Sequence, residues 1–171
     1  MKTNLTLPAM LLLGLFLPGC ASPPLKTVSS VDLQRYSGKW YEIARYPNWF
    51  QRKCACQSTA EYAPQANGSI KVTNTCLDKK GQTIQAIGRA WVVPDSGNAK
   101  LKVSFFGPFT GDYWVIALDP KYQWAVVGHP SRKYLWVLSR EPKLPEKTYQ
   151  HILEEISQAG YDTSRLIKVS N

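Results

Sequence analysis

The stretch that decides the fold runs from residue 38 to residue 50 and reads Gly-Lys-Trp-Tyr-Glu-Ile-Ala-Arg-Tyr-Pro-Asn-Trp-Phe. Its first nine residues alternate as in a β-strand, with one face formed by Trp40, Glu42, Ala44 and Tyr46 and the other by Tyr41, Ile43 and Arg45. Gly38 lies just before the bulky Trp40, which predicts a tight entry into the strand, with the indole closing off a space behind it. Gly-x-Trp also occurs at ordinary tryptophans of a protein core. The rest of the chain must therefore decide whether Trp40 closes off a space or is simply packed in the core.

Residues 1–19 have the composition of a signal peptide. Lys2 provides a charged start, and the apolar run from Met10 to Leu17 is too short to span a bilayer as a helix. The sequence Leu17-Pro18-Gly19-Cys20 that follows resembles the lipobox of bacterial lipoproteins, in which the cysteine is diacylated and becomes the mature N-terminus. Plain secretion with cleavage nearby is the alternative.

Acylation of Cys20 implies a location as well as an anchor. Two or three acyl chains, at about 0.8 kcal/mol per buried methylene, hold a domain far more firmly than one chain can. The resemblance also implies that Ala21, in place of Asp, directs the protein to the bacterial outer membrane, lipid-anchored and facing the periplasm. We expect residues 20–30, with Pro23-Pro24 and several serines, to be a lipidated tether reaching up to about 30 Å from the bilayer.

The formal net charge is +9, but the basic residues are dispersed along the sequence. The adjacent basic pairs are Arg52-Lys53, Lys79-Lys80 and Arg132-Lys133, and no predicted helix carries a basic stripe. This pattern argues against a nucleic-acid partner and favours a loose affinity for anionic lipid headgroups. The remaining length, residues 31–171, suits a single domain.

Three cysteines follow Cys20, at positions 54, 56 and 76. Cys-x-Cys lacks the spacing of a zinc site and no histidine lies near it, so we expect a disulfide and no metal. Cys54 and Cys56 share a strand face, so Cys76 on the next strand could reach either, depending on the register. The sequence leaves both pairings open.

The chain downstream is a series of short alternating segments joined by turns, and only one long helix pattern occurs. That pattern places Tyr149, Ile152, Leu153 and Ile156 on one face, between Pro145 and Gly160. A helical turn over 31–36 and a final strand over 166–169 flank the series. The eight predicted strands cover residues 38–46, 57–62, 69–75, 83–93, 101–106, 113–118, 124–128 and 135–139.

Eight consecutive antiparallel strands predict an all-β protein, namely an eight-stranded antiparallel up-and-down β-barrel with one C-terminal α-helix packed outside. Closure of the sheet removes its two free edges. A barrel of this size has an interior that holds side chains or one small ligand.

Three segments of this chain resemble the three lipocalin signatures. They are Gly-Lys-Trp-Tyr-Glu-Ile-Ala at 38–44, Leu-Asp-Pro-Lys-Tyr at 118–122, and Arg140 after Leu-Trp-Val-Leu-Ser. With the lipobox and the stretch Lys-Val-Ser-Phe-Phe-Gly-Pro-Phe at 102–109, the chain is identified as a member of the bacterial outer-membrane lipocalins, which are similar to apolipoprotein D. Cys-x-Cys beside Phe50 departs from the family pattern and leaves the register of the first hairpin open.

The resemblance implies two sets of functional residues. Trp40 would close the bottom of the barrel, with the guanidinium of Arg140 lying across its indole as a structural pair. The ligand-binding positions carried over from the family, or placed on the same strand faces, are Glu42, Ala44, Val72, Asn74, Gly88, Ala90, Val103, Phe105, Trp114, Ile116, Tyr134 and Trp136. Among them Asn74, Glu42 and Tyr134 would orient a polar headgroup. No cofactor is implied.

The function expected from this family is to bind and store or transport fatty acids, phospholipids or lysophospholipids, with a role in envelope maintenance. One alternative is an enzyme acting on a small apolar substrate, but neither His129 nor His151 has a sequence partner typical of catalysis. The other is a structural lipoprotein with a filled barrel, which the small residues Gly88 and Ala90 argue against. A homodimer is left open.

Overall fold

A computed structural model describes residues 23–171, so the predicted signal peptide at 1–19 and the predicted acylation site Cys20 lie outside the described residues. Its elements are α1 Leu33–Tyr36, β1 Gly38–Arg45, β2 Cys56–Pro64, β3 Ile70–Leu77, β4 Thr83–Val92, β5 Lys100–Phe106, β6 Phe109–Leu118, β7 Trp124–Gly128, β8 Leu135–Ser139, α2 Glu146–Gln158, a 3₁₀ turn Thr163–Arg165 and β9 Ile167–Lys168. Within this part of the chain, no helix is both long and apolar enough to cross a membrane.

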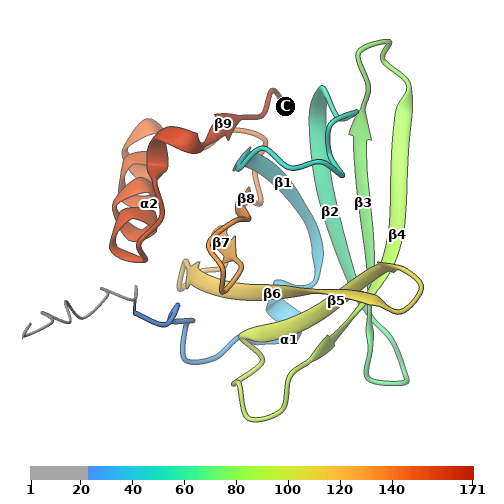
Figure 1. The fold of residues 1–171 in the computed structure, drawn as a ribbon, viewed down its shortest axis with the longest axis vertical. Coiled ribbons are helices and arrows are strands. Elements are labelled where there is room, and N and C mark those ends of the chain that lie inside the picture. The colour runs from blue at the N-terminus through green and yellow to red at the C-terminus, as the bar shows by residue number, and fades with distance from the viewer. Residues whose placement is uncertain (1–22) are drawn as a thin grey trace, which may run out of the picture.

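The strands close into the predicted barrel. Each strand from β2 to β7 pairs with the next, β8 pairs with β1, and β1 pairs back with β2, all antiparallel. The eight-stranded up-and-down barrel is therefore confirmed. The short β9 adds a ninth strand, pairing Lys168 with Ala44 and Ile167 with Arg45 at the end of β1 (Figure 1).

The barrel has two different ends. Because consecutive strands are antiparallel, the turns at residues 65–69, 93–99 and 119–123 share one end with α1, and we call this the closed end. The four connections at residues 46–55, 78–82, 107–108 and 129–134 share the other end, and we call them the mouth loops. Figure 1 shows α1 and the β3–β4 hairpin near opposite ends of the barrel.

The closed end is built around Trp40, whose side chain is fully buried. The guanidinium carbon of Arg140 lies 3.8 Å from the centroid of the Trp40 ring. Arg140 also donates hydrogen bonds to the carbonyls of Lys39 (2.8 Å), Arg35 (2.7 Å) and Ser37 (2.9 Å), and the indole N–H donates to the carbonyl of Tyr36 at 2.8 Å. The planar guanidinium thus covers the indole and, through these hydrogen bonds, fixes the segment 35–39 that leads into β1.

Helix α2 packs outside the barrel, as its single apolar stripe predicts (Figure 1). Its buried residues Tyr149, Ile152 and Ile156 belong to a cluster with outward-facing residues of β7 and β8, among them Val126 and Val137. A separate cluster fills the barrel interior around Trp40 and Val72. Strands β7 and β8 are consequently buried on both faces.

The segment preceding α1 is not a free tether. Leu25 is buried in the cluster beside α2, the N–H of Val28 donates to the carbonyl of Val115 at 3.0 Å, and that of Val31 donates to Gly97 at 2.8 Å. The expectation of an extended spacer over 20–30 is wrong for this part of it, because apolar side chains gain more from burial against the barrel than from solvation. Figure 1 shows this segment, in blue, running outside the strands to α1.

The closed end yields a stability prediction. We expect Arg140→Lys to lower the free energy of unfolding by about 1–2 kcal/mol, because an ammonium group cannot both stack on the indole and donate to three carbonyls. The exposed Arg89 on the outer face of β4 provides the control variant Arg89→Lys, which should melt like the wild type. Thermal melts measure both, and equal melting temperatures for the two variants would contradict a structural role for Arg140.

Candidate ligand-binding site

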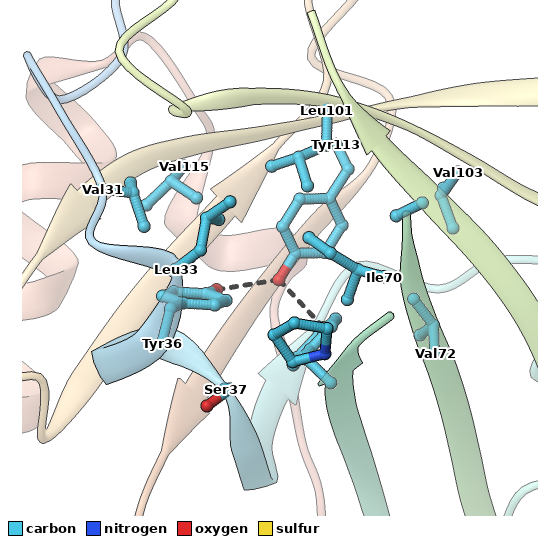
Figure 2. A pocket seen from close by; sticks show the side chains of 13 residues that line it. Val31, Leu33, Tyr36, Ser37, Ile70, Val72, Leu101, Val103, Tyr113 and Val115 are labelled. Atoms are coloured by element: carbon cyan, nitrogen blue, oxygen red, sulfur yellow. Dashed lines mark hydrogen bonds between the residues drawn. The ribbon is translucent and has the colours of Figure 1, made fainter. Parts of the chain in front are cut away.

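We call the half of the barrel interior nearer the closed end the lower interior and the half nearer the mouth loops the upper interior. The lower interior holds a small apolar pocket between α1 and the strands (Figure 2). It contains the predicted residues Val72, Ala90 and Val103. Its other lining residues are Val31, Leu33, Tyr36, Ser37, Tyr62, Pro64, Ile70, Leu101, Tyr113 and Val115. The free volume is about 20 Å³, which is room for little more than one water molecule. An acyl chain would therefore have to lie above this pocket or displace its side chains.

The upper interior is lined by smaller residues. Val72 faces inward and pairs with Gly88, so alternation also turns Asn74 and its partner Ala86 inward. All three of Asn74, Ala86 and Gly88 are only half-buried. Inward-facing side chains thus keep solvent access in the half of the barrel nearer the mouth loops.

Gly88 allows a close approach of β5. A Cβ at this position would lie 2.5 Å from the Ser104 carbonyl oxygen and 2.7 Å from the Phe105 ring. The ring of Phe105 therefore occupies the space that a side chain at position 88 would otherwise fill. Of these two predicted ligand residues, Phe105 is the one that presents side-chain surface to the interior.

Three tyrosine hydroxyls form a chain across the lower interior, and two of them, those of Tyr36 and Tyr113, are shown in Figure 2. The hydroxyls of Tyr36 and Tyr113 are 2.8 Å apart, and Tyr113 donates to Tyr62 at 2.9 Å. Burial raises the pKa of all three phenols, so they stay neutral and able to donate hydrogen bonds at physiological pH.

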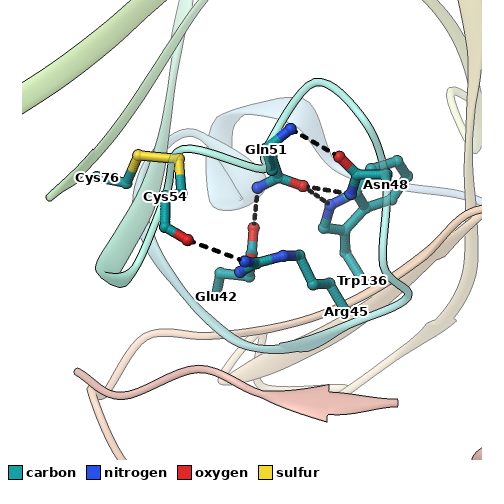
Figure 3. Close-up of a disulfide and its surroundings, with 7 residues drawn as sticks. All are labelled: Glu42, Arg45, Asn48, Gln51, Cys54, Cys76 and Trp136. Carbon is teal, nitrogen blue, oxygen red and sulfur yellow. Dashed lines mark hydrogen bonds and ion pairs between the residues drawn. A yellow bond between two sulfur atoms is a disulfide. The ribbon is translucent and has the colours of Figure 1, made fainter. Parts of the chain in front are cut away.

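A polar network lies in the interior below the mouth loop 46–55 (Figure 3). Glu42 and Arg45 are both buried and form an ion pair. Gln51 donates to Glu42 at 2.7 Å and accepts from the indole N–H of Trp136 at 3.0 Å and from Asn48 at 2.7 Å. Glu42 and Trp136 were predicted site residues. Arg45, Gln51 and Asn48 were missed, because ideal alternation places Arg45 on the outer face and the loop sequence carries no periodicity.

Burial determines the protonation of this network. It raises the pKa of Glu42 above its usual value, and the nearby Arg45 and Gln51 only partly oppose this. The Arg45 guanidinium also donates to the carbonyl of Cys54 at 3.3 Å, so the network reaches the disulfide loop. A charged or dipolar ligand group in the mouth would meet the Arg45 guanidinium as a donor, the Glu42 carboxylate as an acceptor and the Gln51 amide in one place.

The predicted Tyr134 and Trp136 form an aromatic wall beside this network. Their rings stack with centroids 6.1 Å apart, and Phe50 from the mouth loop packs 5.7 Å from Tyr134 and 6.2 Å from Trp136. Phe50 in turn contacts the exposed Trp49 at 5.6 Å. Aromatic surface is therefore continuous from the interior to the solvent-exposed rim.

Ala44 does not face the interior, contrary to the alternation predicted for β1. The pairing of β1 with β8 shifts register between Glu42 and Ala44, as in a β-bulge. Beyond this point Ala44 packs in the cluster outside the barrel, while Arg45 turns inward to Glu42. A one-residue irregularity exchanges the faces of every residue that follows it.

Trp114 and Ile116 also lie on the wrong face for the predicted ligand set. The interior face of β6 is formed by Tyr113 and Val115, whereas Trp114 and Ile116 pack against the cluster on the side of α2. The Trp114 ring lies under the ammonium group of Lys100, 4.4 Å away. Placing these residues by likeness to the family gave a strand phase that was wrong by one residue.

The disulfide joins Cys54 to Cys76, with the two Cα atoms 5.5 Å apart (Figure 3). Strand β2 is irregular between Cys56 and Thr59, which sets Cys56 opposite Leu77 and leaves Cys76 to the loop cysteine. Cys56 is a free thiol. The bond fastens the mouth loop that supplies Asn48 and Gln51. Within residues 23–171 no group of three or more potential metal ligands occurs.

His129 has partners that its sequence neighbourhood did not suggest. Its Nδ1 lies 2.8 Å from the Ser131 hydroxyl and accepts from the Ser131 N–H at 3.1 Å, and its Nε2 is 3.8 Å from Asp112. Asp112 is held by Lys102 at 2.7 Å and is beyond hydrogen-bond distance of the ring. The local contacts of Ser131 are those of a tight turn, so this group stabilises the β7–β8 loop.

The buried Glu42 makes stability depend on pH. Because its folded pKa is raised, the stability it contributes is full below the unfolded pKa, near 4.5, and is lost as the pH rises through the folded pKa. Glu42→Gln removes this titration, so the melting temperature of the variant minus that of the wild type should increase from pH 4 to pH 7. Exposed Glu61 offers the control Glu61→Gln. A difference for Glu42→Gln that does not vary with pH would disprove the assignment.

Comparison with known proteins agrees with this architecture. The model of the lipocalin-like domain family matches residues 31–171. The chain is 42% identical to the outer membrane lipoprotein Blc of Vibrio cholerae over 164 residues, covering 94% of this chain and 95% of that protein. It is 42% identical to temperature-induced lipocalin-1 of Arabidopsis thaliana (84% and 81% covered) and 31% identical to mouse apolipoprotein D (86% and 79% covered).

The fold itself recurs in a solved structure of lower sequence identity. Insecticyanin of the tobacco hornworm superposes with a TM-score of 0.71 at 24% identity, covering 88% of this chain and 86% of that one. The shared features are the closed antiparallel barrel and the helix that follows it. With a family match that extends from the segment before α1 to the C-terminus, the chain belongs to the lipocalin family.

Proposed function

We propose that this protein is an outer-membrane lipoprotein that binds single lipids in the upper half of its barrel. Fatty acids, lysophospholipids and phospholipids are the ligand class, held for storage or transport within the envelope. The observation that carries the proposal is the juxtaposition of an apolar, partly accessible interior with the buried Glu42–Arg45–Gln51 network at the mouth. This arrangement is complementary to an amphiphile.

The distribution of polarity sets the direction of the ligand. The acyl chain would enter first and contact Phe105, Val103 and the ring of Trp136, while its polar group would stay with Arg45 and Gln51. Burying about ten methylenes at roughly 0.8 kcal/mol each gives some 8 kcal/mol before ordering costs, which remove several kcal/mol. This balance predicts micromolar or weaker affinity, because a Kd of 1 μM already corresponds to about 8 kcal/mol.

Support for the location comes from the relatives and from the N-terminal sequence. Three bacterial relatives that cover most of this chain are named outer membrane lipoproteins. Leu-Pro-Gly-Cys at 17–20 provides the matching acylation site at Cys20. The acyl chains would anchor the protein in the outer membrane, with the barrel on the periplasmic side.

A filled barrel remains a second candidate because the lower pocket has only about 20 Å³ of free volume. In that case the protein would act as a structural lipoprotein without a lipid ligand. The two candidates differ in one measurable property. Organic extraction of purified protein followed by mass spectrometry, and titration with a fluorescent fatty acid, detect a lipid only if the upper interior is open.

Neighbouring residues on β4 supply a sharp test of the binding site. Ala86 faces the interior and Ile87 is exposed on the outside, with 55% of its surface accessible. Ala86→Trp should fill the upper interior and weaken fatty-acid binding at least tenfold, a loss of about 1.4 kcal/mol. Ile87→Trp should bind as the wild type does. Equal binding by both variants, with both folded, would place the ligand elsewhere.

The anchor is tested separately. Cys20→Ala should abolish labelling by radioactive palmitate and shift the protein from the membrane pellet to the soluble fraction, because no acyl chain can then be attached. Cys56→Ala removes the free thiol inside the described domain and serves as the control, which should keep the label. If the wild type never incorporates palmitate, the lipoprotein proposal is wrong.

A further inference from the structure

Large aromatic side chains are exposed at one end of the barrel. Trp49, Phe50, Phe106 and Phe109 have 65%, 46%, 67% and 77% of their surface accessible. All four belong to two mouth connections, the loop 46–55 and the β5–β6 hairpin around residues 107–108. Exposed aromatic surface of this extent is typical of a docking site. Tryptophan in particular favours the headgroup region of a bilayer, where its ring is half apolar and half polar.

The same end gathers basic residues that are scattered in the sequence. The mouth loops expose Arg52, Lys53, Lys79, Lys80 and Lys133. The one carboxylate in these loops is Asp78, which accepts the backbone N–H groups of Lys80 and Gln82. The closed-end turns instead carry Asp95, Asp119 and Lys121. Aromatic and cationic side chains together match the interface of an anionic membrane.

The described chain also begins beside a mouth loop. Arg132, in the loop 129–134, donates from Nη2 to the carbonyl of Pro23 at 2.8 Å and from Nε to the carbonyl of Ala159 at 2.9 Å. Cys20 precedes Pro23 by three residues, a reach of about 10 Å for an extended chain. An acyl anchor on Cys20 would therefore bring the bilayer to this loop rather than hold it at a distance.

We propose that the mouth of the barrel docks on the surface of the anchoring membrane. The aromatic side chains of the mouth loops enter the headgroup region and the basic side chains contact lipid phosphates. Phe50 then links the bilayer to Trp136 inside the barrel, so a lipid passes between membrane and interior without crossing water. This inference rests on the proposed anchoring for the origin of the short tether, and it deepens the proposed lipid binding.

Quenching of tryptophan fluorescence by brominated lipids tests this orientation. The full-length protein is purified with its native N-terminus and reconstituted into phosphatidylethanolamine–phosphatidylglycerol vesicles with brominated acyl chains. Trp49 and Trp91 are both exposed, but Trp91 lies on the outer wall of β4 toward the closed end. Trp49→Phe should lose most of the lipid-dependent quenching, whereas Trp91→Phe should retain it. A brominated lipid bound inside the barrel quenches both variants alike and cancels in the comparison.

The outcomes separate this inference from the anchoring proposal. Mass spectrometry of the N-terminal peptide reports acylation independently, and the quenching comparison is read in the same way with or without acyl chains. Loss of quenching in Trp91→Phe, or in neither variant, overturns the mouth orientation even when Cys20 is acylated. Dimerisation that Trp49→Phe abolishes, with no quenching in the wild type, also overturns it, since a second copy would then cover the mouth.

The basic residues of the mouth loops provide a second test of the proposal, with a matched control. Lys79→Gln/Lys80→Gln removes two mouth charges and should lower the Trp49 quenching on anionic vesicles. Lys71→Gln/Lys121→Gln removes two exposed charges away from the mouth loops and should leave it unchanged. Each headgroup contact by Lys or Arg changes membrane affinity roughly fivefold. Equal quenching in the two double variants would overturn the electrostatic part of the proposal.

Discussion

The stacking of Arg140 on Trp40 is the contact on which the closed end depends. An eight-stranded barrel removes its sheet edges by closure but leaves two open ends, and apolar residues such as Val72 and Leu101 would otherwise face water there. Trp40 fills this opening with a rigid apolar ring, and Arg140 covers the ring while donating to the carbonyls of the incoming chain. One end can therefore be sealed without a long loop or a second domain, which leaves the other end available for function.

The β-bulge in β1 has the opposite effect at the mouth. Without the shift between Glu42 and Ala44, Arg45 would face α2 and Glu42 would be a buried carboxylate with only Gln51 for support. The bulge turns Arg45 inward beside Glu42, so each charge neutralises the other in a site where an isolated ion would be strongly disfavoured. It also places Ala44 in the cluster outside the barrel, at the point where β1 pairs with β9. The same irregularity thus shapes both the polar network and the helix-covered wall.

Much of this fold could be predicted from sequence, because turns and alternation are local signals. The eight strands, the outside helix and the contact between Trp40 and Arg140 follow from such patterns or from family likeness. What failed was strand phase. Ala44 was predicted to face the interior because no residue type in β1 indicates a bulge. Trp114 and Ile116 were assigned to the wrong face of β6. Gln51 and Asn48 lie in a loop, where only the three-dimensional path brings Gln51 to Trp136 and Asn48 to Gln51. Cys54 rather than Cys56 reaches Cys76 for the same reason, since β2 starts with an irregularity.

The uneven filling of the barrel gives it a direction. At the closed end, three buried tyrosine hydroxyls and a ring of apolar side chains leave almost no free volume, so this region contributes to the stability of the fold and offers no room for a ligand. Toward the mouth, small or half-buried residues such as Asn74 and Ala86 line the wall, and the polar network stands where a headgroup would stay. An amphiphile entering such a barrel can lower its free energy in only one orientation, with the chain toward Tyr62 and the polar group toward Arg45. Direction in binding therefore arises from where the protein places its own polar groups and needs no moving part.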